Sequence, residues 1–178
     1  IQQLDGEILL LIQQYLRTDM LTPFMKSVTF LGNGGWFWIL CAVVLLAVPK
    51  TRKTGYAAAL SLIFGAIVTN LLLKNIVARP RPFAEIEALI PMITKPKDFS
   101  FPSGHTTASF AVALVMLRML PKKFGIPAVV LAALVAFSRL YLCVHYPTDV
   151  LTGFVIALVG SMLSVWIVRT KPEDKQVH

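Results

Sequence analysis

Five apolar runs constrain the fold of this chain more than any other feature. They occupy residues 36–48, 55–77, 104–120, 126–142 and 148–168, and short polar or basic segments separate them. A helix needs about 20 apolar residues to cross a bilayer. The composition agrees, since 56% of the 178 residues are hydrophobic and only 15% are charged. No run alternates strictly between apolar and polar residues, which disfavours membrane β-strands. We therefore predict an all-α, polytopic membrane helical bundle with five spans.

The N-terminal part of the chain does not fit this pattern. A span through it would place Arg17 and Asp19 inside the bilayer, which is costly. We expect one or two amphipathic helices lying at the membrane interface, broken near Pro23 and at the GNGG of residues 32–35. The prediction is a single domain with interfacial helices over 1–34, a catalytic bundle over 35–169 and a cytoplasmic tail over 170–178.

Basic residues gather in segments that alternating spans bring to one membrane face. These segments contain nine of the seventeen basic residues: Lys50, Arg52, Lys53, Arg118, Lys122, Lys123, Arg169, Lys171 and Lys175. The positive-inside rule makes this face cytoplasmic and the other face external. Although the net charge is +8, the sequence shows no basic helix face with interleaved aromatic residues, so we exclude nucleic acid as a partner. No feature indicates an oligomeric state.

Three stretches that carry reactive side chains fall at the opposite, outer face. The first, KNIVARPRP, carries Lys74 and Arg81 near the end of a span. In the second, FPSGHTTAS, Ser103 is a natural N-cap residue and Gly104 permits close backbone approach. The free N–H groups of a helix start form an anion site, and His105 follows directly. The third is SRLYLCVHYPTD, with the residues Arg139, His145 and Asp149.

These residue types indicate phosphoryl transfer. The forked guanidinium group of arginine and the charged ammonium group of lysine both suit binding to phosphate oxygens. His145 and Asp149 are four residues apart, so a helix that begins near Pro147 lets the carboxylate reach back to the ring. The carboxylate would then fix the tautomer and leave the other ring nitrogen free to attack phosphorus. His105, on a different helix, can protonate the leaving group.

Other charges near these stretches receive simpler interpretations. Arg79 is ambiguous between an anchor at the membrane interface and a contact that supports the site, and we favour the anchor. The loop over residues 83–100 is expected to border the entrance, and its charges are interpreted as solvated: Glu85, Glu87, Lys95, Lys97 and Asp98.

Read as K-x6-RP, PSGH and SR-x5-H-x3-D, the sequence resembles the type 2 phosphatidic acid phosphatase superfamily over residues 74–149. The matching residues are Lys74, Arg81, Pro82, Pro102, Ser103, Gly104, His105, Ser138, Arg139, His145 and Asp149. The resemblance implies a helical bundle and a metal-independent phosphatase or diphosphatase that needs no cofactor. It also implies that His145 forms a phosphohistidine, that Asp149 orients it and that His105 protonates the leaving oxygen. Lys74, Arg81, Ser103, Gly104 and Arg139 would hold the phosphate.

The resemblance also sets expectations for topology and substrate. Family members often have six spans, so either a segment missing before Ile1 carried one or residues 1–34 substitute for it. The spans disfavour the family's soluble vanadium-dependent haloperoxidases and favour a lipid phosphate in the plasma membrane, with the active site on the outer face. Undecaprenyl diphosphate, phosphatidylglycerophosphate and phosphatidic acid are the candidates, the first slightly favoured. Two alternatives stay open: a protein that binds or transports lipid phosphates without turnover, and a phosphatase of soluble phosphate esters.

Overall fold

The computed structural model describes residues 2–170, and helices provide all the regular structure in that range, as predicted. The shorter segments are η1 (Asn33–Gly35), η2 (Pro49–Thr51), the π-helical η3 (Ile67–Leu73), α5 (Lys74–Val77) and α6 (Pro82–Glu85). The longer helices are α1 (Gln2–Tyr15), α2 (Leu21–Phe30), α3 (Trp36–Ala47), α4 (Arg52–Ala66), α7 (Gly104–Met119), α8 (Lys122–Tyr141) and α9 (Pro147–Thr170). The predicted tail, 170–178, lies outside the described residues except for Thr170.

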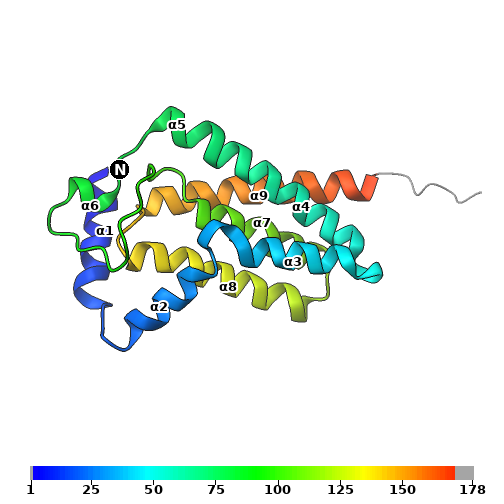
Figure 1. Cartoon of the computed structure of the whole chain (residues 1–178), viewed down its shortest axis with the longest axis horizontal. Coiled ribbons are helices and arrows are strands. Elements are labelled where there is room, and N and C mark those ends of the chain that lie inside the picture. The colour runs from blue at the N-terminus through cyan, green and yellow to red at the C-terminus, as the bar shows by residue number, and fades with distance from the viewer. Residues whose placement is uncertain (1, 171–178) are drawn as a thin grey trace, which may run out of the picture.

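Helix α7 is the centre of the bundle. It packs against α3, α4, α8 and α9, which run beside it along the long axis of the molecule (Figure 1). Its middle turns are fully buried and built from small or β-branched side chains, among them Ala111, Val112, Ala113 and Val115. These side chains let four neighbours approach closely in a medium that offers little hydrophobic drive between helices. The N-terminus of α7 is therefore held rigidly, and the PSGH segment lies at that end.

The five predicted spans are not confirmed. Three helical stretches are long and apolar enough to cross a membrane, namely 49–85, α8 and α9, and α2 with α3 forms a possible fourth, bent by 44°. Helix α7 has only 16 residues, about 24 Å at 1.5 Å per residue, which is less than a bilayer core of about 30 Å. The apolar run over residues 104–120 coincides with this helix and is only one residue longer.

The N-terminal region forms α1 and α2, and the break predicted near Pro23 falls just before α2. Pro23 lies in the first turn of α2, where a missing N–H is tolerated, and the break falls between the helices, at residues 16–20. Helix α1 lies across one end of the bundle (Figure 1). It buries Leu9 and Ile12 against the turn after α8 and the loop after α6, so this helix is packed on the protein.

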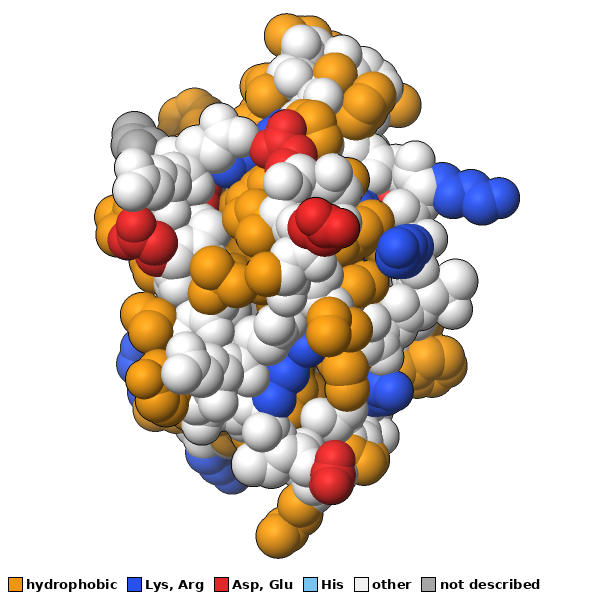
Figure 2. All heavy atoms as spheres, turned by 90° about the vertical axis from the view of Figure 1, so that its left-hand side faces the viewer, with side chains coloured by type: hydrophobic (Ala, Val, Ile, Leu, Met, Phe, Trp, Pro, Cys, Tyr) orange, Lys and Arg blue, Asp and Glu red, His pale blue; other side chains and the backbone are white. Residues whose placement is uncertain are grey.

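The two ends of the bundle differ in charge. The end formed by the α3–α4 and α7–α8 connections and the C-terminus of α9 carries seven basic residues within 2–170: Lys50, Arg52, Lys53, Arg118, Lys122, Lys123 and Arg169. The acidic residues of the described chain lie in segments at the other end: Asp5, Glu7, Asp19, Glu85, Glu87, Asp98 and Asp149. Figure 2 looks onto this second end, where acidic, basic and hydrophobic side chains are mixed.

Candidate active site

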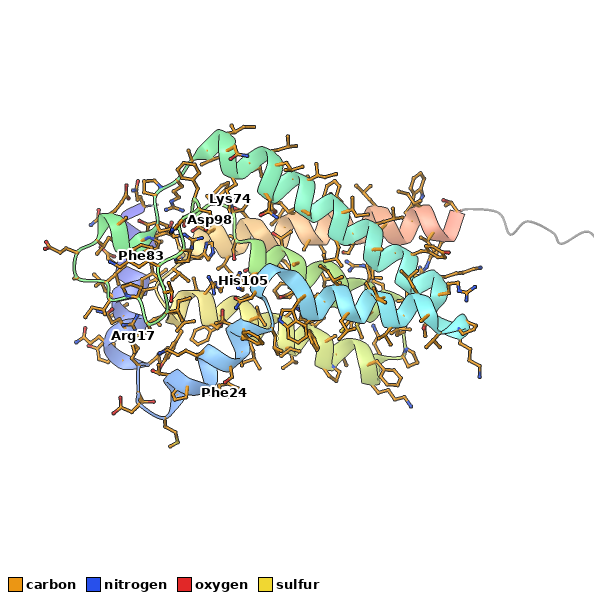
Figure 3. The ribbon with its side chains drawn as sticks, viewed as in Figure 1. Arg17, Phe24, Lys74, Phe83, Asp98 and His105 are labelled. Atoms are coloured by element: carbon orange, nitrogen blue, oxygen red, sulfur yellow. The ribbon has the colours of Figure 1, made fainter. Side chains whose placement is uncertain are left out.

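A cavity of about 1070 Å³ lies where the three stretches meet. Six of the eight predicted site residues line it: Lys74, Arg81, Gly104, His105, Arg139 and His145. Figure 3 labels His105, at the start of α7, and Lys74, at the start of α5, which both line this cavity. Ser103 and Asp149 are fully buried and do not line the cavity. The two histidines therefore open into one space, although forty residues separate them in the chain.

A tight turn between α8 and α9 positions His145. Cys143 adopts a left-handed conformation with φ of 54°, which reverses the chain within a few residues, and α9 then begins at Pro147 as the sequence indicated. His145 Nδ1 lies 3.4 Å from Asp149 Oδ2, and Nε2 lies 3.4 Å from Arg81 Nη1. The first contact is not a hydrogen bond, since Nδ1 has no hydrogen-bond partner among residues 2–170, but Nδ1 lies beside the carboxylate. The Nε2 atom therefore faces the cations of the cavity.

The carboxylate of Asp149 is surrounded by donors. Its Oδ1 accepts a hydrogen bond from Arg79 Nη1 at 2.8 Å, and its Oδ2 accepts one from the backbone N–H of Tyr146 at 2.8 Å and another from the Ser100 hydroxyl. A buried carboxylate is stable only when such partners compensate for lost water. The sequence reasoning missed Ser100, because a serine in an irregular loop carries no local signal for this contact.

The surroundings of His145 favour its neutral form. Burial lowers the pKa of His145 to about 4; the neighbouring carboxylate of Asp149 opposes this shift, and the cations Arg139 and Arg81 add to it. A neutral imidazole keeps the lone pair that a nucleophile needs.

This lowered pKa predicts the acid side of the pH profile. A lowered pKa means that the ring takes up its proton only at lower pH, so the reactive form is lost as the pH falls through about 4 and not through the ordinary value near 6.5. We expect the acid limb of kcat/KM, which reports the ionising groups of the free enzyme, to lie below about pH 5. An acid limb with its midpoint near pH 6.5 would contradict this environment for His145.

The PSGH segment is organised by its serine. Ser103 is the N-cap of α7, as predicted, and its Oγ accepts from the Thr106 hydroxyl at 2.9 Å and, more weakly, from the Thr106 backbone N–H at 3.4 Å. Its own N–H donates to the Asp149 carbonyl oxygen at 3.1 Å, which ties the start of α7 to the start of α9. The serine hydroxyl is therefore engaged in capping the helix, while Gly104 and His105 face the cavity.

The imidazole of His105 is held by the turn before α3. Its Nε2 lies 3.0 Å from Asn33 Oδ1, a contact that the sequence did not suggest. Gly32 lies against the same ring, since a Cβ built on Gly32 would come within 2.5 Å of His105 Cδ2 and 2.9 Å of Val135 Cγ1. The GNGG turn thus fixes the orientation of His105.

We expect Gly32→Ala to displace the His105 ring and to lower kcat by about 10- to 100-fold, because small misplacements of a reacting group cost that much. Gly160→Ala is the matched control, since its Cβ would meet only the ring of Phe64 outside the cavity. Steady-state release of inorganic phosphate measures both variants. Equal activity in the two would show that the Gly32 contact does not set the position of His105.

Six basic residues of the described chain line the cavity, and the protein holds each of the three that the sequence predicted as phosphate ligands. Asp98 bridges two of them, with Oδ2 at 2.5 Å from Lys74 Nζ and Oδ1 at 2.7 Å from Arg81 Nη2 (Figure 3). Arg139 Nη1 donates to the Thr29 hydroxyl of α2 at 2.6 Å, and its Nε has no hydrogen-bond partner among residues 2–170. Positive groups that line one cavity suit an anion such as phosphate.

Two interpretations of charged residues from the sequence are wrong. Asp98 is not simply solvated: burial alone would raise its pKa, but Lys74 and Arg81 outweigh burial and lower the pKa to about 2. Asp98 therefore remains a carboxylate paired with both cations. Arg79 is not an anchor at the membrane interface, because its guanidinium forms ion pairs with Asp5 and Asp149 and its side chain is only 16% exposed.

The cavity extends from the polar end into an apolar region between α3 and α4. Its walls there consist of Ile39, Ala42, Val43 and Leu46 from α3 and Ala59, Leu62, Ile63 and Ala66 from α4. A site for a small soluble ester has no need of such a wall, whereas a lipid chain would lie along it.

The comparisons with known proteins agree with this geometry. The sequence profile of the PAP2 superfamily matches residues 54–173. An undecaprenyl-diphosphatase of Sulfolobus acidocaldarius is 36% identical over 148 residues, covering 82% of this chain and 71% of that protein. The undecaprenyl-diphosphatase BcrC of Bacillus subtilis is 37% identical over 147 residues, covering 82% and 74%.

A solved structure gives the same result for the fold. The crystal structure of a transmembrane PAP2-type phosphatidylglycerolphosphate phosphatase from Bacillus subtilis aligns with a TM-score of 0.78 and 27% identity, covering 98% of this chain and 89% of that one. The profile covers more than half of this chain, and the relatives are phosphatases. The chain therefore belongs to the PAP2 superfamily and is an enzyme of its phosphatase type.

Proposed function

We propose that this protein removes phosphate from a lipid phosphate or diphosphate by way of a covalent phosphohistidine on His145, without a metal ion. The observation that carries the proposal is that one cavity is lined by both His105 and His145, by Lys74, Arg81 and Arg139, and by an apolar wall. The histidines supply the bond-making chemistry, the cations bind and stabilise the phosphoryl group, and the apolar wall binds the lipid.

In the first step, Nε2 of His145 attacks phosphorus and the bond to the leaving oxygen breaks. His105 donates a proton to that oxygen, so the lipid departs as a neutral alcohol or as a monophosphate. In the second step, water attacks phosphorus, the bond between phosphorus and Nε2 of His145 breaks, His105 takes a proton from the water, and inorganic phosphate leaves. Lys74, Arg81, Arg139 and the Gly104 N–H stabilise the charge that builds on the phosphoryl oxygens.

Ser103 and Asp149 support this chemistry from behind the cavity wall. Ser103 caps α7 and thereby fixes Gly104 and His105. Asp149 holds the Nδ1 side of His145, which keeps the lone pair on Nε2. The second role follows the pattern in which a buried carboxylate sets the tautomer of a catalytic histidine.

The proposed substrates are undecaprenyl diphosphate, phosphatidylglycerophosphate and phosphatidic acid. The apolar wall between α3 and α4 supports a long hydrocarbon chain. The similarity to proteins named undecaprenyl-diphosphatase supports undecaprenyl diphosphate as the first candidate. The basic residues at the opposite end of the bundle support a plasma-membrane orientation in which the cavity opens on the outer face.

The direct test is release of inorganic phosphate by purified protein in detergent, with the three lipid phosphates and a short-chain ester as substrates and EDTA present throughout. We expect turnover of at least one long-chain substrate in EDTA, inhibition by orthovanadate, and much slower turnover of the short-chain ester. Loss of activity in EDTA with recovery on adding metal would refute the metal-independent mechanism. Lipid that binds without hydrolysis would favour a binding or transport protein, and equal rates for short and long esters would favour a phosphatase of soluble esters.

A further inference from the structure

Arg79 links a residue of the first helix to the candidate active site. Its Nη1 donates to Asp149 Oδ1 at 2.8 Å, and its Nη2 donates to Asp5 Oδ2 at 2.8 Å. Both carboxylates are buried, with side-chain exposures of 0% for Asp149 and 3% for Asp5. The part-buried guanidinium lies between two buried carboxylates, so removing it would leave their charges uncompensated.

The chain around Arg79 is shaped to place the guanidinium there. Ala78 ends α5 in a left-handed conformation with φ of 47°, which is unfavourable for a residue with a Cβ. Such strain persists only where the surrounding contacts determine it. The guanidinium carbon also lies 3.8 Å from the centroid of the Tyr146 ring, a cation–π contact next to His145.

Asp5 contacts both Arg79 and the first turn of α9. Its Oδ1 accepts from the backbone N–H of Thr148 at 3.1 Å, so it satisfies one of the free N–H groups in the first turn of α9. The Thr148 hydroxyl in turn accepts from Arg79 Nη1 at 2.7 Å. Asp5, Arg79 and Thr148 therefore fix the first turn of the helix that carries Asp149.

We propose that Arg79, held in place by Asp5 of α1, is a positioning residue for catalysis. It acts through Asp149, whose carboxylate it orients and whose charge it compensates, and Asp149 in turn orients His145. This inference rests on the proposed role of His145 as the nucleophile. It makes α1, which lies outside the region matched by the family profile, a part of the catalytic support.

The test compares five variants by kcat and KM for phosphate release and by the Ki for orthovanadate. Arg79→Gln removes the charge and is expected to lower kcat by about 10- to 100-fold, the range found when a residue that orients a functional group is lost. KM and the vanadate Ki should change by less than about threefold, because Arg79 does not line the cavity. Arg79→Lys keeps a charge but reaches only one carboxylate at a time, so it should restore part of the loss.

Asp5→Asn alone should lower kcat by about 3- to 10-fold, since Arg79 still compensates Asp149. The informative variant is the double mutant. With Arg79→Gln, Asp5 and Asp149 lose the cation that both of them contact, and Asp5→Asn then removes one of the two uncompensated charges. We therefore expect the double mutant to be more active than Arg79→Gln alone. If Arg79 and Asp5 only stabilised the fold, the reductions in kcat caused by the two substitutions would multiply instead.

Arg118→Gln is the matched control, because Arg118 is a half-buried arginine at the other end of the bundle, bonded to Leu114 O and Ser161 Oγ. Its kcat should stay within about twofold of the wild type. The inference is overturned if Arg79→Gln matches this control, or if the double mutant is less active than both single mutants. If Arg79→Gln does not fold, an unchanged kcat in Asp5→Asn overturns it.

The outcome for the proposed function is read separately, from the wild type and His145→Ala. If the His145→Ala variant is as active as the wild type, the phosphohistidine mechanism is refuted. The positioning role through Asp149 is then refuted with it. Activity that depends on His145 but not on Arg79 or Asp5 refutes only the positioning role.

Discussion

His145→Ala is expected to lower kcat by about 10⁵- to 10⁶-fold, which is the size of loss seen when the nucleophile of a covalent mechanism is removed. His145 is 2% exposed, its Nε2 faces Arg81 and the cavity, and its other nitrogen is directed to Asp149. Of the two histidines in the described chain, 2–170, it is the one directed by a carboxylate. Release of phosphate from a long-chain substrate measures the loss.

The control for this variant separates lost chemistry from lost fold. Because the cations and the apolar wall are unchanged, His145→Ala should still bind the lipid phosphate with a Kd within about tenfold of the wild-type KM. It should also elute as the wild type does on gel filtration in detergent. A folded His145→Ala protein that retains a few per cent of the wild-type kcat would show that the phosphoryl group does not pass through this imidazole.

Asp149→Asn is expected to lower kcat by about 10³- to 10⁴-fold with little change in KM, as in other catalytic units where a buried aspartate fixes the histidine tautomer. The contacts of Asp149 add a second reason. Its oxygens accept from Arg79, Ser100 and the Tyr146 N–H, so either orientation of an amide turns an NH₂ group toward a donor. The side chain keeps its volume, but the buried arrangement loses an acceptor and a charge.

Asp19→Asn is the matched control for this substitution, because Asp19 is an exposed residue between α1 and α2. We expect its kcat and KM to equal those of the wild type within about twofold. If Asp149→Asn raised KM and left kcat unchanged, Asp149 would act in substrate binding and not in orienting His145.

The sequence encodes those parts of the site that depend on short spacings. PSGH predicts a capped helix start, and Ser103 caps α7. His145 and Asp149 are four residues apart, and Pro147 lies between them. This spacing predicts a carboxylate about one helical turn from the imidazole, and α9 does begin at Pro147. These relations are set by local backbone geometry, so a single sequence is enough to derive them.

The contacts that the sequence did not reveal join distant segments. Asp5 meets Arg79 across 74 residues, Asn33 meets His105 across 72, and Thr29 meets Arg139 across 110. No periodicity marks such pairs, because each depends on how α1, α2 and the GNGG turn pack against the bundle. All three partners lie before residue 54, where the family profile begins. The N-terminal region thus touches each of the three signature stretches, or a residue beside it.

The number of membrane spans could not be predicted from apolar runs, for a different reason. The run over residues 104–120 is apolar, like its neighbours. However, α7 has 16 residues and is enclosed by four other helices. An apolar run indicates only that the segment lies in apolar surroundings. These can be either other helices or lipid, which are equally apolar. Helix length and exposure come from the packing, which the run itself does not encode.

The most direct measurement is to quench the working enzyme in alkali with a radiolabelled lipid phosphate and to map the labelled peptide. Phosphohistidine is stable to alkali and labile to acid, so the expected result is acid-labile label on the peptide that contains His145, formed no more slowly than turnover and missing from His145→Ala. An enzyme that turns over normally with no labelled protein at any quench time, or with the label on another residue, would contradict the covalent mechanism.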